Sequence, residues 1–186
     1  MLTRSEITER LAGVLLLAGV LIAPVLPGSA LGGDDARAPD FTLANLSGKD
    51  ITLSELLAGG PVILDFWATW CKPCIRAFSD LEALSSEYKD RGLTVVAVSV
   101  DGPKSMARVA PFIHSKKYSF EVLYDTEGRV AKKYNVISIP RTVLISPDST
   151  IAYATVGYRP SNHAKIEESL IPLLPHGAAE GGDVVE

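Results

Sequence analysis

Two cysteines, Cys71 and Cys74, are the residues of this 186-residue chain best suited to carry chemistry. They follow the apolar run 61–67, which is typical of a strand buried on both faces. They stand at the start of a predicted helix, 72–90, in which apolar side chains recur at helical spacing. One helical turn brings such a pair within disulfide-bonding distance. At the helix N-terminus the helix dipole favours the thiolate of Cys71, whereas Cys74 begins the apolar stripe and is expected to be shielded.

The chemistry that this arrangement permits is thiol–disulfide exchange. Cys71 would form a mixed disulfide with a partner, and Cys74 would resolve it by closing the internal Cys71–Cys74 disulfide. Lys72 would favour the thiolate further, and Pro73 suits a first helical turn, where its missing N–H is not needed. The exchange requires no cofactor and no metal.

A structural disulfide and a metal site are the alternatives that two cysteines leave open. A bridge that closes so few residues constrains the unfolded chain little, so it would stabilise the fold only modestly. The histidines are scattered along the sequence, at His114, His163 and His176. One close cysteine pair with scattered histidines is a poor ligand pattern, and we expect no metal site.

Composition excludes several classes of protein. The formal net charge is −4 and the sequence has no basic block, which argues against a nucleic-acid partner. Only two of the residues are cysteines, which excludes a disulfide-stapled miniprotein and a zinc ribbon.

The N-terminal segment 1–30 is predicted to be a signal peptide or a signal anchor. The apolar stretch 11–26 precedes Gly28 and Ala30, which stand at positions −3 and −1 of a small-residue cleavage site. An uncleaved membrane anchor through residues 11–26 is the alternative. Either outcome places the folded part outside the cytoplasm. We expect a linker at 31–37, one domain at 38–174 and a disordered tail at 175–186.

The pattern of apolar runs within 38–174 predicts an α/β fold with a mixed sheet and helices on both faces. A hairpin is expected from two alternating runs, 41–43 and 51–53. Further strands are expected at 61–67, 93–100, 121–124, 142–145 and 151–156. Helices are expected at 72–90, which Gly92 ends, at 104–116, which Pro111 interrupts, and at 127–134 and 160–171.

Two segments of the chain resemble the thioredoxin family. Residues 65–74 are similar to the thioredoxin active-site segment, and Ile139-Pro140 is similar to that fold's cis-proline loop. Three further features resemble the TlpA/ResA branch of this family. They are the run 67–71, the strand end 97–101 with a helical insertion after it, and the export signal. The resemblance implies a thioredoxin-like fold over 38–174, with an N-terminal β-hairpin and a helical insertion.

The cis-proline resemblance implies further site residues. Pro140 is expected to be cis and to lie against the cysteines. The backbone of Ile139 would then be turned outward, where it can pair with an extended substrate segment. Trp70 is expected to cover the cysteines at the surface.

Asp65 lies inside the apolar run, where a carboxylate is costly to ionise, so we expect its pKa to be raised. The resemblance implies that it exchanges a proton with Cys74. The chain departs from its relatives at three positions. ResA-like proteins commonly have Asn in place of Asp65 and Glu in place of Ala77, and thioredoxins often pair the Asp with a Lys where Ala97 stands here.

The resemblance implies an exported thiol–disulfide oxidoreductase that reduces protein disulfides, for example in apocytochrome c or copper-site proteins. Its electrons would come from a thiol carrier in the membrane, and its place would be the periplasm or another extracytoplasmic compartment. A peroxiredoxin-like peroxidase is one alternative, but Thr69 stands two residues before Cys71 rather than the required three. A non-enzymatic copper chaperone is the other, although its cysteines usually stand three apart.

Overall fold

The computed structural model describes residues 37–175. The predicted signal segment 1–30, residues 31–36 of the predicted linker and the predicted tail beyond Pro175 therefore lie outside the described residues. No helix within 37–175 has the length and apolar character needed to cross a bilayer.

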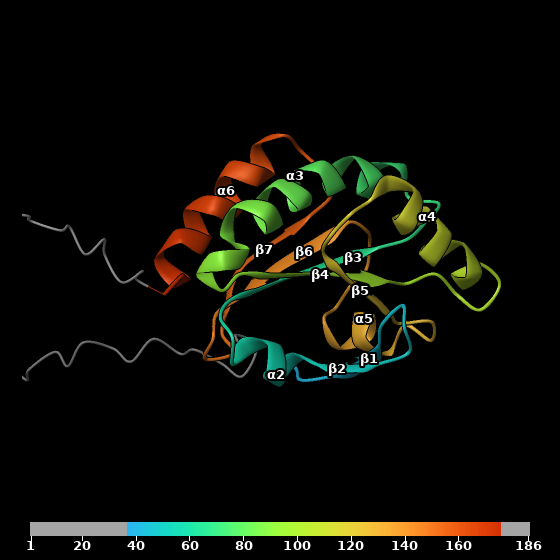
Figure 1. Ribbon diagram of the computed structural model, residues 1–186, viewed down its shortest axis with the longest axis horizontal. Coiled ribbons are helices and arrows are strands. Elements are labelled where there is room, and N and C mark those ends of the chain that lie inside the picture. Colours follow the sequence, from blue (N-terminus) through green and yellow to red (C-terminus); the bar gives the residue numbers. More distant parts are fainter. Residues whose placement is uncertain (1–36, 176–186) are drawn as a thin grey trace, which may run out of the picture. The chain divides into compact units, whose positions relative to one another are not determined.

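A five-stranded mixed sheet forms the centre of the fold, with the strand order β5-β4-β3-β6-β7 (Figure 1). Strands β3, β4 and β5 are parallel, whereas β6 is antiparallel to β3 and β7 is antiparallel to β6. Their bounds are Val62–Trp67, Thr94–Ser99, Glu121–Tyr124, Arg141–Ile145 and Ile151–Val156. The hairpin pairs β1 (Thr42–Ala44) with β2 (Asp50–Thr52). The predicted mixed sheet and N-terminal hairpin are thus confirmed.

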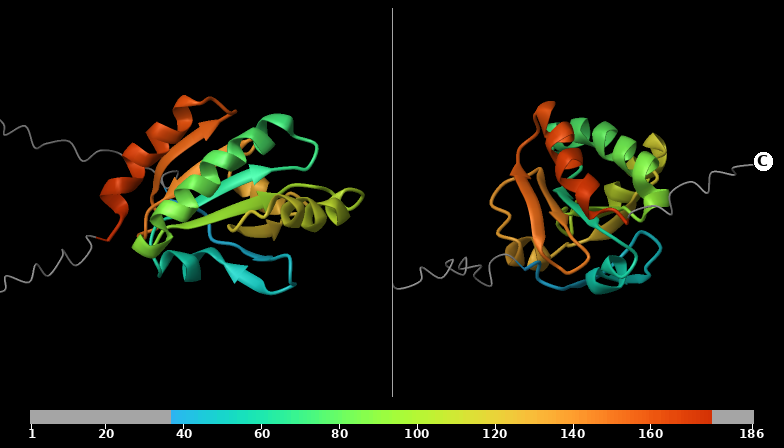
Figure 2. Two further views of the ribbon diagram at one scale, coloured as in Figure 1. Left: turned by 45° about the horizontal axis from the view of Figure 1, so that its top comes forward. Right: turned by 90° about the vertical axis from the view of Figure 1, so that its left-hand side faces the viewer.

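Helices cover both faces of the sheet, as the two views of Figure 2 show. One face carries α3 (Lys72–Tyr88), α4 (Val109–Lys116) and α6 (Ser161–Leu170). The other face carries α2 (Leu53–Leu57), α5 (Arg129–Lys133) and the hairpin. Short 3-10 turns are formed by Lys89–Arg91, Met106–Arg108 and Ile171–Leu173.

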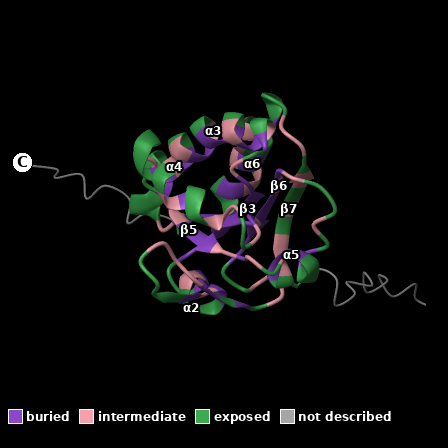
Figure 3. Ribbon diagram, turned by 90° about the vertical axis from the view of Figure 1, so that its right-hand side faces the viewer, coloured by how far each residue is buried: buried purple, intermediate pink, exposed green. Residues whose placement is uncertain are grey.

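The central strand β3 is buried on both sides, which explains its nearly continuous apolar run. Ile63 and Trp67 belong to the core beneath α3, α4 and α6, whereas Leu64 and Phe66 pack with the hairpin, α2 and α5. Side chains alternate along a strand, so Asp65 shares the face of Ile63 and Trp67. Figure 3 shows the buried strands between helices whose outer surfaces are exposed.

The prediction for the helix at 104–116 was wrong in one respect, because Pro111 does not interrupt it. The α-helix begins only at Val109, after the 3-10 turn, and Pro111 therefore lies in its first turn. The backbone N–H groups of a first turn have no partner within the helix, so proline costs nothing there.

Helix α2 was not predicted. Leu53 was assigned to the second hairpin strand, but it is the first residue of α2 and is buried together with Leu57. A helix of five residues contains only one repeat of the helical spacing. So short an apolar pattern cannot be distinguished from that of a strand.

Candidate active site

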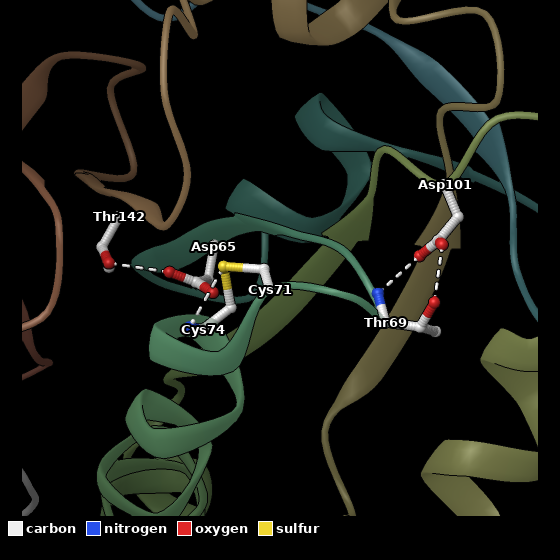
Figure 4. The surroundings of a disulfide bond; sticks show 6 residues. All are labelled: Asp65, Thr69, Cys71, Cys74, Asp101 and Thr142. Atoms are coloured by element: carbon white, nitrogen blue, oxygen red, sulfur yellow. Dashed lines mark hydrogen bonds between the residues drawn. A yellow bond between two sulfur atoms is a disulfide. The ribbon is translucent and has the colours of Figure 1, made fainter. Parts of the chain in front are cut away.

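The two cysteines form a disulfide at the N-terminus of α3, just beyond the end of β3 (Figure 4). Cys71 is the N-cap residue of α3, and its Sγ accepts a hydrogen bond of 3.3 Å from the Cys74 N–H. Pro73 lies in the first turn of the helix. The sulfur of Cys71 thus occupies the place where a helix stabilises negative charge.

The two sulfurs differ in their surroundings. The Cys71 residue is 5% exposed, whereas Cys74, in the first turn of α3, is fully buried. Trp70 is 64% exposed next to Cys71, and Lys72 is exposed on its other side. A partner that approaches from solvent therefore meets Cys71 first.

Asp101 fixes the loop that leads into the cysteines. It is fully buried immediately after β4. Its carboxylate accepts hydrogen bonds from the Thr69 N–H at 2.8 Å, from the Thr69 hydroxyl at 2.7 Å and from the Ser99 hydroxyl at 3.1 Å. The hydroxyl of Thr69 is thereby engaged away from the sulfurs. Sequence reasoning treated Asp101 only as a strand end, because nothing local in the sequence indicates that β4 lies beside β3.

The Ile139–Pro140 peptide bond is cis, as the resemblance implies. It immediately precedes β6, whose first residue Arg141 pairs with Phe66 near the end of β3. The loop therefore lies at the same end of the sheet as the disulfide. Within residues 37–175, neither the N–H nor the C=O of Ile139 forms a hydrogen bond.

An apolar groove of about 440 Å³ lies beside this loop. It is lined by Trp70, Val100, Ala131 and residues 136–139. Ile137 is 96% exposed at its edge, which is unusual for so large an apolar side chain. Sequence reasoning did not single out Ile137, because exposure depends on how the loop folds over α5.

Asp65 is fully buried at the middle of the sheet. Its neighbours in register are Ala97 on β4 and Thr142 on β6. The Thr142 hydroxyl donates a hydrogen bond of 2.7 Å to Oδ1, while Oδ2 has no partner among the described residues. In Figure 4 the carboxyl lies between Thr142 and the disulfide.

Burial raises the pKa of Asp65 to about 7, and the hydrogen bond from Thr142 opposes part of that rise. The direction is the one that the sequence predicts. Ala97 stands beside the carboxyl where thioredoxins often have a lysine, so β4 offers no cation to stabilise the ionised form. Asp65 is therefore able to gain or lose a proton near neutral pH.

The described residues contain no group of three or more His, Cys, Asp or Glu side chains that could hold a metal ion. His114 lies on α4 and His163 on α6, on separate helices from the cysteines. The third histidine, His176, falls outside the described residues.

Residues 35–154 match the AhpC/TSA family. The chain belongs to the AhpC/TSA family. Among its relatives in this family is the thiol-disulfide oxidoreductase ResA of Bacillus subtilis, which is 36% identical over 124 residues, 67% of this chain and 68% of the relative. The thioredoxin-like protein YneN of the same organism is 39% identical over 122 residues, 65% of this chain and 70% of YneN.

Solved structures agree with the thioredoxin-like fold of this AhpC/TSA member. A putative thiol:disulfide interchange protein DsbE from Chlorobium tepidum superposes with a TM-score of 0.69 at 32% identity, covering 75% of this chain and 96% of the other. A peroxidoxin, BcpB from Mycobacterium tuberculosis, shares the fold at 23% identity with a TM-score of 0.64, over 75% of this chain and 96% of that one. Together with the Cys71–Cys74 pair, the ResA-named relatives identify a thiol–disulfide oxidoreductase.

Asp65→Asn is expected to raise the free energy of unfolding of the oxidised protein by an amount that grows with pH. Between about pH 4 and about pH 7 the folded state keeps a proton on Asp65 that the unfolded state has released, so the wild type loses stability as pH rises. Above that window both states are ionised and the loss levels off, at about 4 kcal/mol.

Urea unfolding of both proteins at a series of pH values measures this difference. Asp50→Asn, which changes an exposed carboxylate on β2, is the control and should shift stability by less than about 0.5 kcal/mol. A difference between wild type and Asp65→Asn that stays constant with pH would contradict the buried, proton-holding carboxyl.

Proposed function

We propose that this oxidoreductase is an extracytoplasmic reductase of protein disulfides, in which Cys71 attacks the substrate and Cys74 resolves the mixed disulfide. The difference in access between the two sulfurs supports these roles most directly, because Cys71 keeps 5% exposure while Cys74 has none. The N-cap position of Cys71 supports the role of nucleophile, since a thiolate there is stabilised by the helix N-terminus.

The reaction transfers two electrons from the reduced pair to the substrate. The Cys71 thiolate attacks one sulfur of the substrate disulfide, whose other sulfur leaves as a thiolate and takes up a proton. The Cys74 thiolate then attacks the Cys71 sulfur, which closes the internal disulfide and releases the second substrate sulfur as a thiolate that also takes up a proton. The Cys71–Cys74 pair is oxidised and the substrate is reduced to a dithiol.

Asp65 is proposed to accept the proton of Cys74 before the second attack. In the view of Figure 4 its carboxyl points toward the disulfide, and its pKa of about 7 allows the ionised form to exist at neutral pH. A buried thiol needs such a base, because water does not reach it.

Substrates are proposed to bind as extended segments beside the disulfide. The unpaired backbone N–H and C=O of Ile139 can add such a segment in the manner of an extra strand. The apolar groove next to Trp70 then receives a side chain of the segment. Lys72 and Pro73 follow Cys71 and are proposed to contact the substrate, and Pro140 is proposed to lie against the sulfurs.

The cellular setting follows from the predicted export signal at 1–30 and from the resemblance to the TlpA/ResA branch. We propose that the domain at 38–174 works outside the cytoplasm, with residues 11–26 as a cleaved signal or a membrane tether, 31–37 as a linker and 175–186 as a tail. A thiol carrier in the membrane would supply electrons, and apocytochrome c or copper-site proteins are proposed substrates.

Wild-type protein is expected to accelerate the reduction of insulin by dithiothreitol, whereas Cys71→Ser should abolish the acceleration. Cys74→Ser should accumulate a mixed disulfide with insulin, because the resolving sulfur is missing. Insulin turbidity and mass spectrometry measure both effects.

Two results would contradict the proposal. One is the absence of acceleration by wild type, and the other is trapping by Cys71→Ser in place of Cys74→Ser. Consumption of hydrogen peroxide by Cys74→Ser would instead favour the peroxidase alternative.

The direction of electron flow is tested by the reduction potential of the Cys71–Cys74 pair, measured by equilibration with glutathione. A reductase is expected to lie near thioredoxin, at about −270 mV. A value near that of DsbA, about −120 mV, would make the protein an oxidant and overturn the proposed direction.

Ile137→Ser is expected to raise KM for a protein disulfide about fivefold with little change in kcat, because it removes apolar contact from the groove but leaves the sulfurs in place. Ile171→Ser is the matched control, since Ile171 is also an exposed isoleucine, at 49%, but does not line the groove. Steady-state kinetics with insulin provide the measurement. Equal KM values for both variants would remove the groove from substrate binding.

A further inference from the structure

Asp65 has few polar neighbours through which a proton could leave it. From β4 it meets Ala97, which carries no titratable group. In the view of Figure 4 the carboxyl points toward the disulfide, and within residues 37–175 its one hydrogen bond comes from Thr142 on β6. Among the described residues, therefore, the Thr142 hydroxyl is the one polar group that touches this carboxyl.

A cavity of about 20 Å³ is lined by Thr142 together with residues of α3 and α6 and of the segments that flank β6 and β7. This volume accommodates about one water molecule. Ala77 and Thr142 line it, and Asp80, Tyr158 and His163 supply polar and titratable groups. Among the described residues, Arg76 also acts electrostatically on Tyr158, and the cysteines titrate only when the disulfide is reduced.

We propose that Thr142 is a positioning residue that connects Asp65 to this cavity, so that protons pass between the buried carboxyl and solvent through the threonine hydroxyl and a cavity water. The proposal rests on the proposed role of Asp65 as the base for Cys74. Thr142 suits the task because a hydroxyl is at once a donor and an acceptor.

The transfer balances as a relay of proton hops. Cys74 gives its proton to Asp65, and the neutral carboxyl then donates to the Thr142 oxygen while that hydroxyl gives its own proton to the cavity water. The proton then passes from the cavity water to solvent, and Asp80 and His163 are polar residues that line the cavity. The Thr142 hydroxyl, which donates to Asp65 at the start, turns to the cavity water before these hops. After them the proton received from Asp65 forms the hydrogen bond to the carboxylate again, and no electron is transferred.

The size of Ala77 is part of the same argument. ResA-like proteins commonly carry a glutamate at this position, and its carboxyl would occupy space beside the cysteines. The alanine leaves the wall of the cavity open next to Thr142. Both Ala77 and Thr142 line this cavity.

Three variants test the role of Thr142. Thr142→Val keeps the β-branched shape but removes the hydroxyl, and Thr142→Ser restores it. Thr155→Val is the matched control, because Thr155 pairs with Thr142 in the β6–β7 register and forms no hydrogen bond with Asp65. The infrared C=O band that Asp65→Asn removes reports the protonation of Asp65 in each protein, without any need for turnover.

Thr142→Val is expected to move the midpoint of this titration upward by about one pH unit, since a hydrogen bond that favours the ionised form is lost. The resolution step should slow about tenfold, measured by stopped flow, while mixed-disulfide formation by Cys71 is unchanged. Thr142→Ser and Thr155→Val should match wild type in both measurements. Ala77→Val, which fills the cavity, should slow resolution but leave the titration midpoint in place.

A midpoint and a resolution rate for Thr142→Val equal to those of wild type would overturn the proposal. Equal losses in Thr142→Val and Thr142→Ser would also overturn it, because they would show a packing effect. Normal resolution in Ala77→Val would exclude the cavity as the path. The proposed function is tested separately. It fails if the wild-type protein does not accelerate insulin reduction, and that result does not depend on the infrared titration.

Discussion

The burial of β3 on both faces is the constraint on which the rest of the structure depends. All six of its residues are buried, and apolar layers from opposite sides of the sheet enclose them. The chain therefore reaches the surface only at the ends of β3, and the carboxyl end of the strand connects to the N-terminus of α3. Both cysteines are buried at this junction, and only Cys71 retains some exposure to solvent.

The same burial gives the two aspartates of the site different tasks. Asp65 points into the dry layer with one oxygen unpartnered, so its ionised form is costly and its pKa is raised. Asp101 is equally buried, but it accepts three hydrogen bonds from Thr69 and Ser99, and its carboxylate anchors the loop before Cys71. The two buried carboxyls thus differ in the number of hydrogen-bond donors around them.

The AhpC/TSA family includes this chain, and its fold is shared with a peroxidoxin as well as with a thiol–disulfide interchange protein. The fold alone does not choose between these chemistries. The local geometry favours disulfide exchange, because Cys71 has a second sulfur one helical turn away and the Thr69 hydroxyl is held by Asp101. The groove beside Trp70 adds space for a protein segment.

The sequence by itself determined the features that depend on neighbours along the chain. The apolar run predicts β3, the helical spacing predicts α3, and Cys71 and Cys74 fall at their junction. Only the tertiary structure decided what surrounds Asp65, because its partner Thr142 lies 77 residues away and reaches it through strand register. The pairing of Asp101 with Thr69, the cavity behind Thr142 and the exposure of Ile137 share this origin. Periodicity reports which face of an element is buried, whereas contacts between strands depend on how distant segments align, and one sequence carries no local signal of that alignment.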